Sequence, residues 1–233
     1  MNTIKMAVFD MAGTVVDEHN LVYKTIQTSF QDNGYPVTLE KVLAVCAGKE
    51  KYTAIITLVE ALGIQNPTKA LAKDLFDYFK ARLATAYQEE AVAPMPGSEK
   101  VFQYLAEHRV MVVLNTGYDR STAEQLVGRL GWENHPYIQQ MVTASDVAKG
   151  RPEPDMIQLA MAQAKLRNSQ EVIKIGDSQI DILEGRQAHC QMSIGITTGA
   201  HTLEQLQQVD PDAIIDHLQE LIPLLEEMKA LPA

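Results

Sequence analysis

The stretch MAVFDMAGT, residues 6–14, joins a short run of apolar side chains to an acidic residue that small residues follow. Two similar runs occur later, VMVVLNTG at 110–117 and VIKIGDS at 172–178, and each ends in polar residues beside a glycine. Short apolar runs bounded in this way are typical of strands buried in a parallel sheet. Further strands are expected at 192–196 and 213–215, with a short one at 140–142.

Helical patterns separate these strands. Apolar residues recur at helical spacing in four stretches, 99–107, 121–130, 155–164 and 179–188. Alternation of strands and helices predicts an α/β fold with a Rossmann-like, doubly wound parallel sheet. Ligands of such sheets bind beyond the carboxyl ends of the strands. Asp10, Thr116 and Asp177 each follow or end a predicted strand, so we expect them to meet at one edge of the sheet.

The region after the first strand has a different pattern. From about residue 16 to residue 93 there is helical periodicity and no convincing strand. Amphipathic helices are expected at 21–31, 39–46, 52–62 and 70–87. The sequence Pro-Met-Pro-Gly at 94–97 ends this region and indicates a hinge and a helix start. We therefore predict a core domain of residues 1–15 and 95–233 with an inserted helical cap domain of residues 16–94.

Composition narrows the class of protein. The chain has 233 residues, of which 46% are hydrophobic, so it can bury a sizeable core. A net charge of −10 argues against nucleic-acid partners, because that binding depends on lysine and arginine. No apolar run approaches the roughly 20 residues of a membrane span, and a cytoplasmic location is expected. Cys46 and Cys190 lie in no metal-ligand spacing and suggest no disulfide framework.

The acidic residues after the strands suggest chemistry at phosphorus. Asp10, followed by Ala-Gly-Thr, is suited to act as a covalent nucleophile. A carboxylate that attacks an anionic phosphorus centre needs a positive counter-charge, which Mg²⁺ can supply. Asp177 is the expected second ligand, and Asp181, one helical turn further on, would orient the metal site. A small anionic substrate is therefore expected.

Other polar residues could hold the transferred group. The hydroxyl of Thr116 could donate to a phosphoryl oxygen, helped by backbone N–H groups around Gly117. Arg151, within Gly-Arg-Pro at 150–152, could neutralise both the nucleophile and the transferred group. Each residue alone has an ordinary alternative, such as a helix cap or a surface cation. Their joint occurrence, in order and mostly at strand ends, favours a catalytic site.

In this order the segments resemble the four motifs of the haloacid-dehalogenase (HAD) superfamily, and the resemblance spans nearly the whole chain. It implies that Asp10 is the nucleophile and that Thr116 is the hydroxyl of the second motif. Arg151 stands where the third motif usually has lysine, and Asp177 with Asp181 would be the acids that bind Mg²⁺. The resemblance also implies the Rossmann-like core and the helical cap.

The residue at position 12 indicates which branch of the superfamily the chain resembles. Most phosphatases and mutases of the superfamily have a second aspartate there, whereas Ala12 cannot exchange protons and only its carbonyl can reach the metal. With alanine at this position, the chain resembles the phosphonatases, or phosphonoacetaldehyde hydrolases. The segments 116–120, 150–154 and 184–186 also resemble those of phosphonatases. Phosphonatases cleave a carbon–phosphorus bond through a Schiff base on a cap lysine. The leaving carbon then needs no acid at position 12.

The family lysine follows a cap glycine by three residues, which places it at Lys51 after Gly48. Partial desolvation and the positive end of a helix would lower its pKa toward the roughly 7–8 of a nucleophilic amine. The phosphonatase residues that support this lysine, a methionine and a histidine, are Ala47 and Ala54 here. In related mutases the same cap position holds an arginine that contacts phosphate. Lys51 therefore has two interpretations, Schiff-base amine or phosphate contact, and Tyr118 either lines the site or only packs.

Three functions follow from these observations. The first is a Mg²⁺-dependent hydrolase that forms an aspartyl-phosphate at Asp10 and cleaves a small phosphonate such as phosphonoacetaldehyde. The second is a phosphomonoesterase of the phosphoglycolate-phosphatase kind, whose leaving oxygen would take a proton from Glu18, His19 or the substrate itself. The third is a non-catalytic phosphate-binding protein. No membrane partner is expected, and the resemblance implies a homodimer built through the caps.

Overall fold

The computed structural model of this protein describes residues 2–64, 69–89 and 91–232. Its centre is a six-stranded parallel sheet with the order β5-β4-β1-β6-β7-β8. The strands are β1 (Met6–Phe9), β4 (Met111–Thr116), β5 (Ile138–Thr143), β6 (Val172–Gly176), β7 (Met192–Ile196) and β8 (Ala213–Ile215). This arrangement confirms the predicted doubly wound α/β fold. Strand β5 is longer than the strand predicted at 140–142.

The first strand lies at the point where the sheet reverses its strand order. β1 pairs with β4 on one side and with β6 on the other. Phe9 is level with Leu114 in β4 and with Ile175 in β6, so all three strands end together. A crevice opens at such a switch point because the connections leave it in opposite directions. The residues that follow these three strands are therefore neighbours.

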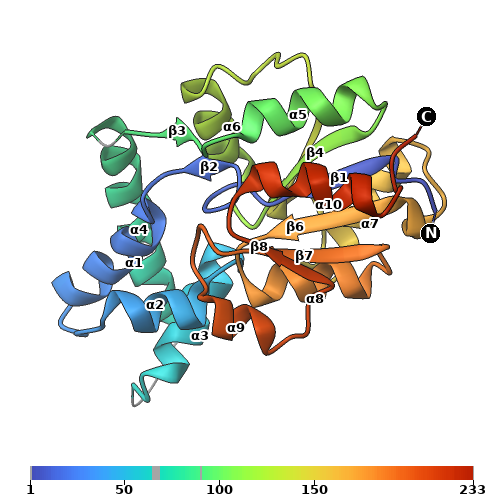
Figure 1. The fold of residues 1–233 in the computed structure, drawn as a ribbon. Helices are drawn as coiled ribbons and strands as arrows, with labels where there is room; N and C mark the ends of the chain where they lie inside the picture. Colours follow the sequence, from blue (N-terminus) through green and yellow to red (C-terminus); the bar gives the residue numbers. More distant parts are fainter. Residues whose placement is uncertain (1, 65–68, 90, 233) are drawn as a thin grey trace.

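Side chains of β1 alternate between two apolar layers. Ala7 and Phe9 belong to one buried cluster together with Phe102, whereas Met6 and Val8 belong to the other. Figure 1 shows α5 and α10 on one side of the sheet and α8 on the other. The helices of the sheet region are α5 (Ser98–Glu107), α6 (Arg120–Arg129), α7 (Asp155–Gln163), α8 (Gln179–Gln187), α9 (Leu203–Gln207) and α10 (Leu221–Glu227). In the described residues, no helix combines the length and apolar character that a membrane span requires.

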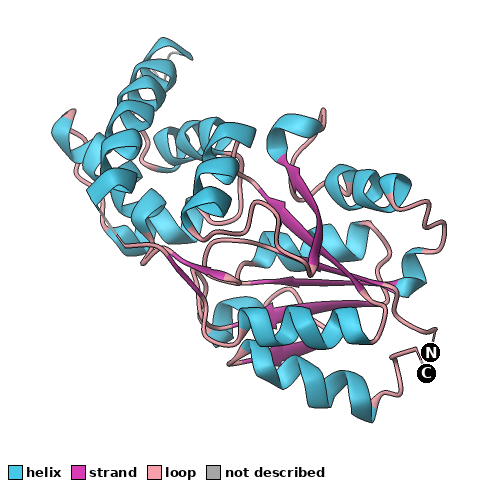
Figure 2. Cartoon of the chain, turned by 90° about the horizontal axis from the view of Figure 1, so that it is seen from above, coloured by secondary structure: helices cyan, strands magenta, loops and turns pink. Residues whose placement is uncertain are grey.

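A helical segment covers one end of the sheet. It consists of α1 (Leu21–Asp32), α2 (Leu39–Cys46), α3 (Lys51–Ala61) and α4 (Lys69–Glu89), close to the helices that periodicity predicts. Consecutive helices pack on one another, and α1 also packs on α4. Figures 1 and 2 show this segment at the end of the molecule away from both chain termini. Its status as a separate cap domain stays a prediction.

The segment of residues 16–93, expected to lack strands, has a short strand at each end. β2 (Val16–Asp17) pairs antiparallel with β3 (Ala93–Pro94), and the N–H of Met95 donates to the carbonyl of Val15 at 2.8 Å. The expectation of no strand between 16 and 93 is therefore wrong at its edges. Strands of two residues have no periodicity, and their pairing joins residues far apart in the chain. The ribbon ties together the two crossings between the sheet and the helical segment.

Candidate active site

Polar side chains meet where the central strands end. Asp10 follows β1, Thr116 ends β4 and Asp177 follows β6. Asp181 lies in the first turn of α8. Carboxylate oxygens of Asp10, Asp177 and Asp181 lie within 4.8 Å of one another, and all three residues are buried. The three acids that the sequence suggested as metal ligands are thus brought together.

Arg151 joins this cluster as a fully buried cation. Its Nη1 lies 2.6 Å from Oδ1 of Asp10 and 2.9 Å from Oδ1 of Asp181. Its Nε donates to Oε2 of Glu184 at 2.9 Å, and its Nη2 donates to the carbonyl of Asn115 at 2.7 Å. The planar guanidinium can meet several acceptors at once, which suits it to such a buried position. Arg151 is thereby fixed beside the carboxylate of Asp10.

A second buried cation, Lys174, was missed by sequence reasoning. It stands in the middle of β6, and its Nζ lies 2.8 Å from Oδ1 of Asp181 and 3.5 Å from Oε2 of Glu184. The same amine donates to Oδ1 of Asn115 at 3.1 Å. The available signal was one lysine inside the apolar run VIKI, because lysine is almost never fully buried unless it is paired.

The pKa values of the acids in the cluster are shifted in different directions. Burial raises the pKa of Asp10, although the charge of Arg151 opposes this. Burial also raises the pKa of Asp177 well above its ordinary value, with further contributions from the charges of Asp10 and Asp181. For Asp181, burial acts in the same direction, but Arg151 and Lys174 hold the pKa below its ordinary value. Asp10 and Asp177 are therefore the two acids of the cluster whose pKa values are raised.

This imbalance fits a divalent cation. Two buried cations, Arg151 and Lys174, face four buried carboxylates, those of Asp10, Asp177, Asp181 and Glu184. A bound cation would neutralise the excess negative charge and lower the raised pKa values. Carboxylate oxygens are the ligands that hard cations such as Mg²⁺ take in proteins. The residues present thus form a suitable donor set for a metal ion.

Side chains of the helical segment close the site. A cavity of about 10 Å³ lies over Asp10, which is room for about one water molecule. Sheet-edge residues and helical-segment residues share its lining, which consists of Asp10, Ala12, Tyr23, Gly48, Lys51, Thr116, Gly117, Tyr118 and Arg151. The sequence-predicted substrate-binding residues therefore face the same space as the predicted nucleophile. Tyr23 was not foreseen.

Two glycines allow this close contact between sheet and helices. A Cβ atom on Gly117 would lie 2.6 Å from the carbonyl oxygen of Gly48 and 3.0 Å from that of Lys49. A Cβ atom on Gly48, whose φ is +71°, would lie 2.1 Å from Cγ2 of Ile180 and 2.6 Å from Oγ of Ser178. Any larger residue at either position would push the two parts of the molecule apart. Both glycines thus hold the loop before Lys51 against the sheet edge.

Lys51 is the first residue of α3 and is buried. Its Nζ donates to the carbonyl of Lys49 at 2.7 Å and lies 5.2 Å and 4.9 Å from the ring centroids of Tyr23 and Tyr118. It makes no ion pair with any residue that the structure describes. Burial lowers its pKa, although Cys46 and nearby acids act in the opposite direction. A lowered pKa raises the share of neutral amine near neutral pH.

The two alternative proton donors lie in different surroundings. Glu18 is only 3% exposed and accepts a hydrogen bond from the hydroxyl of Tyr87 at 3.2 Å. Burial raises the pKa of Glu18 to about 7, although Lys51 and Tyr87 oppose the rise. His19 is exposed, and its Nδ1 lies 3.0 Å from Oδ1 of Asp17. Of these two proton donors, Glu18 is buried and His19 is exposed.

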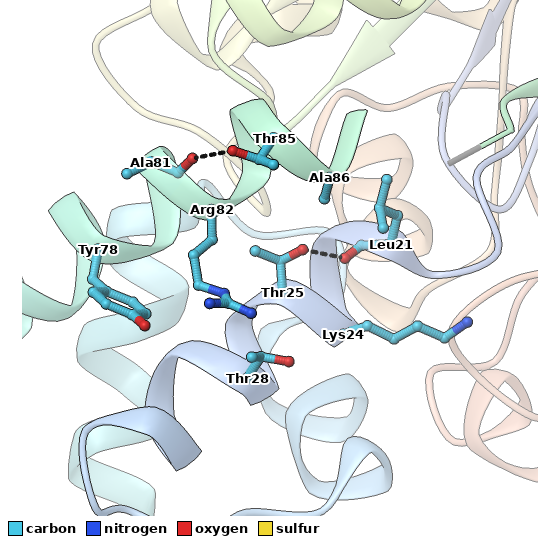
Figure 3. A pocket seen from close by; sticks show the side chains of 9 residues that line it. All are labelled: Leu21, Lys24, Thr25, Thr28, Tyr78, Ala81, Arg82, Thr85 and Ala86. Atoms are coloured by element: carbon cyan, nitrogen blue, oxygen red, sulfur yellow. Dashed lines mark hydrogen bonds between the residues drawn. The ribbon is translucent and has the colours of Figure 1, made fainter. Parts of the chain in front are cut away.

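Wider hollows lie further from the acids. One of about 460 Å³ lies between α1 and α4, and Figure 3 shows threonine, alanine and Arg82 side chains around it. Arg82 lies 3.3 Å from Asp32, which also accepts a hydrogen bond from Tyr78. Another hollow, of about 280 Å³ between α4 and α6, shares Lys51 and Tyr118 with the cavity over Asp10. The second hollow therefore adjoins the cavity over Asp10 at these two residues.

Comparison with known proteins identifies the family. A family profile described as haloacid dehalogenase-like hydrolase matches residues 7–221. The chain belongs to the haloacid dehalogenase-like hydrolases. Within this family it is 28% identical to a phosphonoacetaldehyde hydrolase of Lactiplantibacillus plantarum, over 97% of each chain. It is 23% identical to a phosphoglycolate phosphatase of Yersinia pestis, over 95% of this chain and 93% of that one.

Solved structures agree with the fold of a haloacid dehalogenase-like hydrolase. A phosphonoacetaldehyde hydrolase-like protein from Oleispira antarctica superimposes with a TM-score of 0.82 at 21% identity. The match covers 97% of this chain and 92% of that one. The suspected superfamily and the predicted fold are thus confirmed, and the chain is a hydrolase with both phosphonatase and phosphatase relatives.

Proposed function

We propose that this hydrolase cleaves the carbon–phosphorus bond of a small phosphonate such as phosphonoacetaldehyde. The observation that carries this proposal is that Lys51, whose amine is buried, lines the same cavity as Asp10 and Ala12. Ala12 offers no carboxyl group to protonate a leaving oxygen, whereas a buried amine can form a Schiff base with an aldehyde. The similarity to a phosphonoacetaldehyde hydrolase supports the same substrate class.

On the phosphorus side, the Asp10 carboxylate forms the new oxygen–phosphorus bond and an aspartyl-phosphate, which water then hydrolyses. Arg151, 2.6 Å from Asp10, stabilises the negative charge of the transferred group. The Thr116 hydroxyl oxygen accepts from the N–H of Tyr118 at 3.2 Å, so its own proton is free to bond a phosphonate oxygen. These groups act on any substrate with a terminal phosphorus group.

The acid cluster is the proposed magnesium site. Asp10, Asp177, Asp181 and the backbone carbonyl of Ala12 are the groups that would hold Mg²⁺. When bound, Mg²⁺ neutralises the negative charge shared by the nucleophile and the phosphonate oxygens. Glu184 and Lys174 lie behind this set and fix Asp181 and Arg151 in place.

On the carbon side, the neutral Lys51 amine adds to the aldehyde carbon, and water leaves to give an iminium. When the bond from Asp10 to phosphorus forms, the pair of the breaking carbon–phosphorus bond becomes a C=C bond, the C=N pair moves to nitrogen, and an enamine is left. The enamine takes a proton at carbon and is hydrolysed to acetaldehyde and free Lys51. The departing carbon therefore needs no acid at position 12, and this route is compatible with Ala12.

We infer that residues 16–94 act as a cap that parts from the core of residues 1–15 and 95–233. A cavity of about 10 Å³ cannot hold a phosphonate, so the substrate can bind only when the two parts separate. The contact of Gly117 with the Gly48 loop would have to open in this movement. The β2–β3 ribbon would keep the two linkers paired during this movement.

The similarity to a phosphoglycolate phosphatase favours a second candidate, a phosphomonoesterase for a small phosphorylated metabolite. In that case Lys51 would only contact phosphate. The leaving oxygen would take its proton from Glu18 or from the substrate. The chemistry at Asp10 would be the same in both candidates, so the leaving group distinguishes them.

Phosphate release from phosphonoacetaldehyde in the presence of Mg²⁺ tests the proposal. Asp10→Asn should lower the rate at least about a thousandfold, because the amide cannot form the covalent intermediate. Borohydride added with this substrate should trap an adduct on Lys51 in the wild type and none in Lys51→Arg. Lys41→Arg, which alters an exposed lysine of the same segment, serves as the control and should behave as wild type.

Two outcomes would decide against carbon–phosphorus cleavage. Turnover of phosphonoacetaldehyde without any Lys51 adduct would exclude the Schiff-base route. Asp10-dependent phosphate release from a panel of phosphate esters, with none from the phosphonate, would establish the phosphomonoesterase instead.

A further inference from the structure

One buried carboxyl group near the site has no part in the chemistry at phosphorus. Glu18 lies in the linker between β2 and α1, outside the acid cluster that would hold the metal. It is 3% exposed and accepts a hydrogen bond at 3.2 Å from Tyr87, near the end of α4. It makes no ion pair within the described part of the chain. Burial of a carboxyl group costs free energy unless hydrogen bonds or an opposite charge compensate it.

Four titratable groups from four parts of the fold surround this carboxyl group. Lys51 from α3 is the cation among them, and Tyr87 from α4 is the hydrogen-bond donor. Tyr23 from α1 and Tyr118 after β4 complete the set. The side chain of Tyr118 is buried, and its interaction with Glu18 lowers the pKa of that group. Three of these four groups, all except Tyr87, also line the cavity over Asp10.

On the basis of the Schiff-base function proposed above, we propose that Glu18 is the proton-transferring partner of Lys51 during imine formation. Ala12 cannot serve, and His19 is exposed and paired with Asp17. Glu18 interacts electrostatically with Lys51 and is held by Tyr87 from the helix that borders the adjoining hollow. Glu18 acts only in the formation of the imine at Lys51 and has no role in the attack by Asp10.

The proton transfers balance as follows. As the Lys51 nitrogen bonds to the aldehyde carbon, the carbonyl pair moves to oxygen, and this oxygen takes the proton of Glu18. The nitrogen then returns one proton to the Glu18 carboxylate. That proton passes to the new hydroxyl group, the carbon–oxygen bond breaks, water leaves and the nitrogen lone pair forms the C=N bond. Aldehyde, neutral amine and carboxylic acid thus become iminium, carboxylate and water.

The surroundings suit this exchange. Burial raises the pKa of Glu18 to about 7 and lowers the pKa of Lys51, so the proton affinities of the two groups approach each other. Proton transfer is most efficient when the pKa of the catalytic group lies near the working pH. Tyr87 also lines the hollow of about 280 Å³ between α4 and α6. Glu18 is therefore hydrogen-bonded to a residue that borders this hollow.

Reductive trapping with acetaldehyde and cyanoborohydride tests imine formation without any chemistry at phosphorus. The rate of modification of Lys51 is followed by mass spectrometry at pH values on both sides of 7. In the wild type the rate should fall above about pH 7, as Glu18 loses its proton. Glu18→Gln should be at least about tenfold slower at pH 7 and should lack this fall, because an amide has no proton to lose. Glu60→Gln, an exposed position on the helix of Lys51, should match the wild type.

A second variant gives a directional result if Glu18→Gln does not fold. Tyr87→Phe removes the hydrogen bond that lowers the pKa of Glu18, so the fall in rate should move to higher pH. A fall that stays at the same pH would overturn the role of Glu18. The same conclusion follows if Glu18→Gln shows the wild-type rate and pH profile while Lys51 is still trapped, and carbon–phosphorus cleavage would then stand. If the wild type forms no adduct at any pH, the Schiff-base function and the role of Glu18 both fall.

Discussion

Two buried lysines show how differently the sheet edge and the helical segment treat a charge. Lys174 in β6 lies 2.8 Å from Asp181 and 3.5 Å from Glu184. Lys51 in α3 makes no ion pair with a described residue, and it lies against two tyrosine rings and a backbone carbonyl. At the sheet edge, acids thus compensate the charge of the buried cations. In the helical segment, burial instead shifts the pKa values of groups such as Lys51 and Glu18. Lys174 is thus held by ion pairs with two acids, whereas burial without an ion pair to a described residue lowers the pKa of Lys51.

The largest effect is expected from Lys174→Met. Loss of this cation would leave the buried carboxylates of Asp181 and Glu184 with Arg151 alone. Removal of one partner from a buried ion pair destabilises proteins by about 3–5 kcal/mol. Denaturant unfolding at neutral pH measures the change in the free energy of unfolding. The exposed Lys100→Met is the control and should change it by no more than about 0.5 kcal/mol. A loss as small as that of the control would refute compensation at the sheet edge.

The next effect is a pH dependence from Glu18. Its pKa is about 7 in the folded protein and 4.5 in the ordinary, unfolded state. Between these values the folded protein holds a proton that the unfolded chain has released, so stability falls as pH rises, by about 1.4 kcal/mol per pH unit. Above about pH 7 both states have released it, and the loss is complete. Glu18→Gln lacks this proton and should gain stability relative to the wild type across the window. Parallel stability curves would show that burial does not shift this acid.

The smallest effect is expected from Lys51→Met, the counterpart of the first substitution. Methionine fills similar space without a charge, and no described acid is left unpaired by the change. The free energy of unfolding should stay constant or rise by about 1 kcal/mol, since apolar residues replace buried charges at little or negative cost. The same unfolding measurement applies. A destabilisation as large as that of Lys174→Met would remove the contrast between the two regions.

The sheet and its acidic edge were predictable because they depend on local pattern and chain order. Apolar runs mark the strands, and parallel strands end at one edge, so Asp10, Thr116 and Asp177 had to be neighbours. The helices of the inserted segment also follow from periodicity. The placement of Lys51 over Asp10 could be expected only from the resemblance to phosphonatases, because no local pattern says how a helical segment docks on a sheet.

The remaining features depend on contacts between distant residues. The pairing of Lys174 with Asp181 and Glu184 joins a strand to the following helix, and the sequence shows only an unexplained lysine in a strand. Glu18 and Tyr87 are 69 positions apart and meet only after α1 to α4 have packed. The β2–β3 ribbon is too short to leave a sequence signal at all.

That ribbon has an evolutionary consequence. Because Asp17 and Ala93 are paired, the chain leaves the sheet region and returns to it at one place. Paired residues of antiparallel strands have Cα atoms about 4.5–5.5 Å apart. Any stretch of polypeptide whose ends lie that close can be spliced between them without stretching a strand, and the entropy of closing a longer loop grows only slowly. If residues 16–94 form the predicted cap, we expect that a lineage could exchange it by replacing one contiguous piece of its gene.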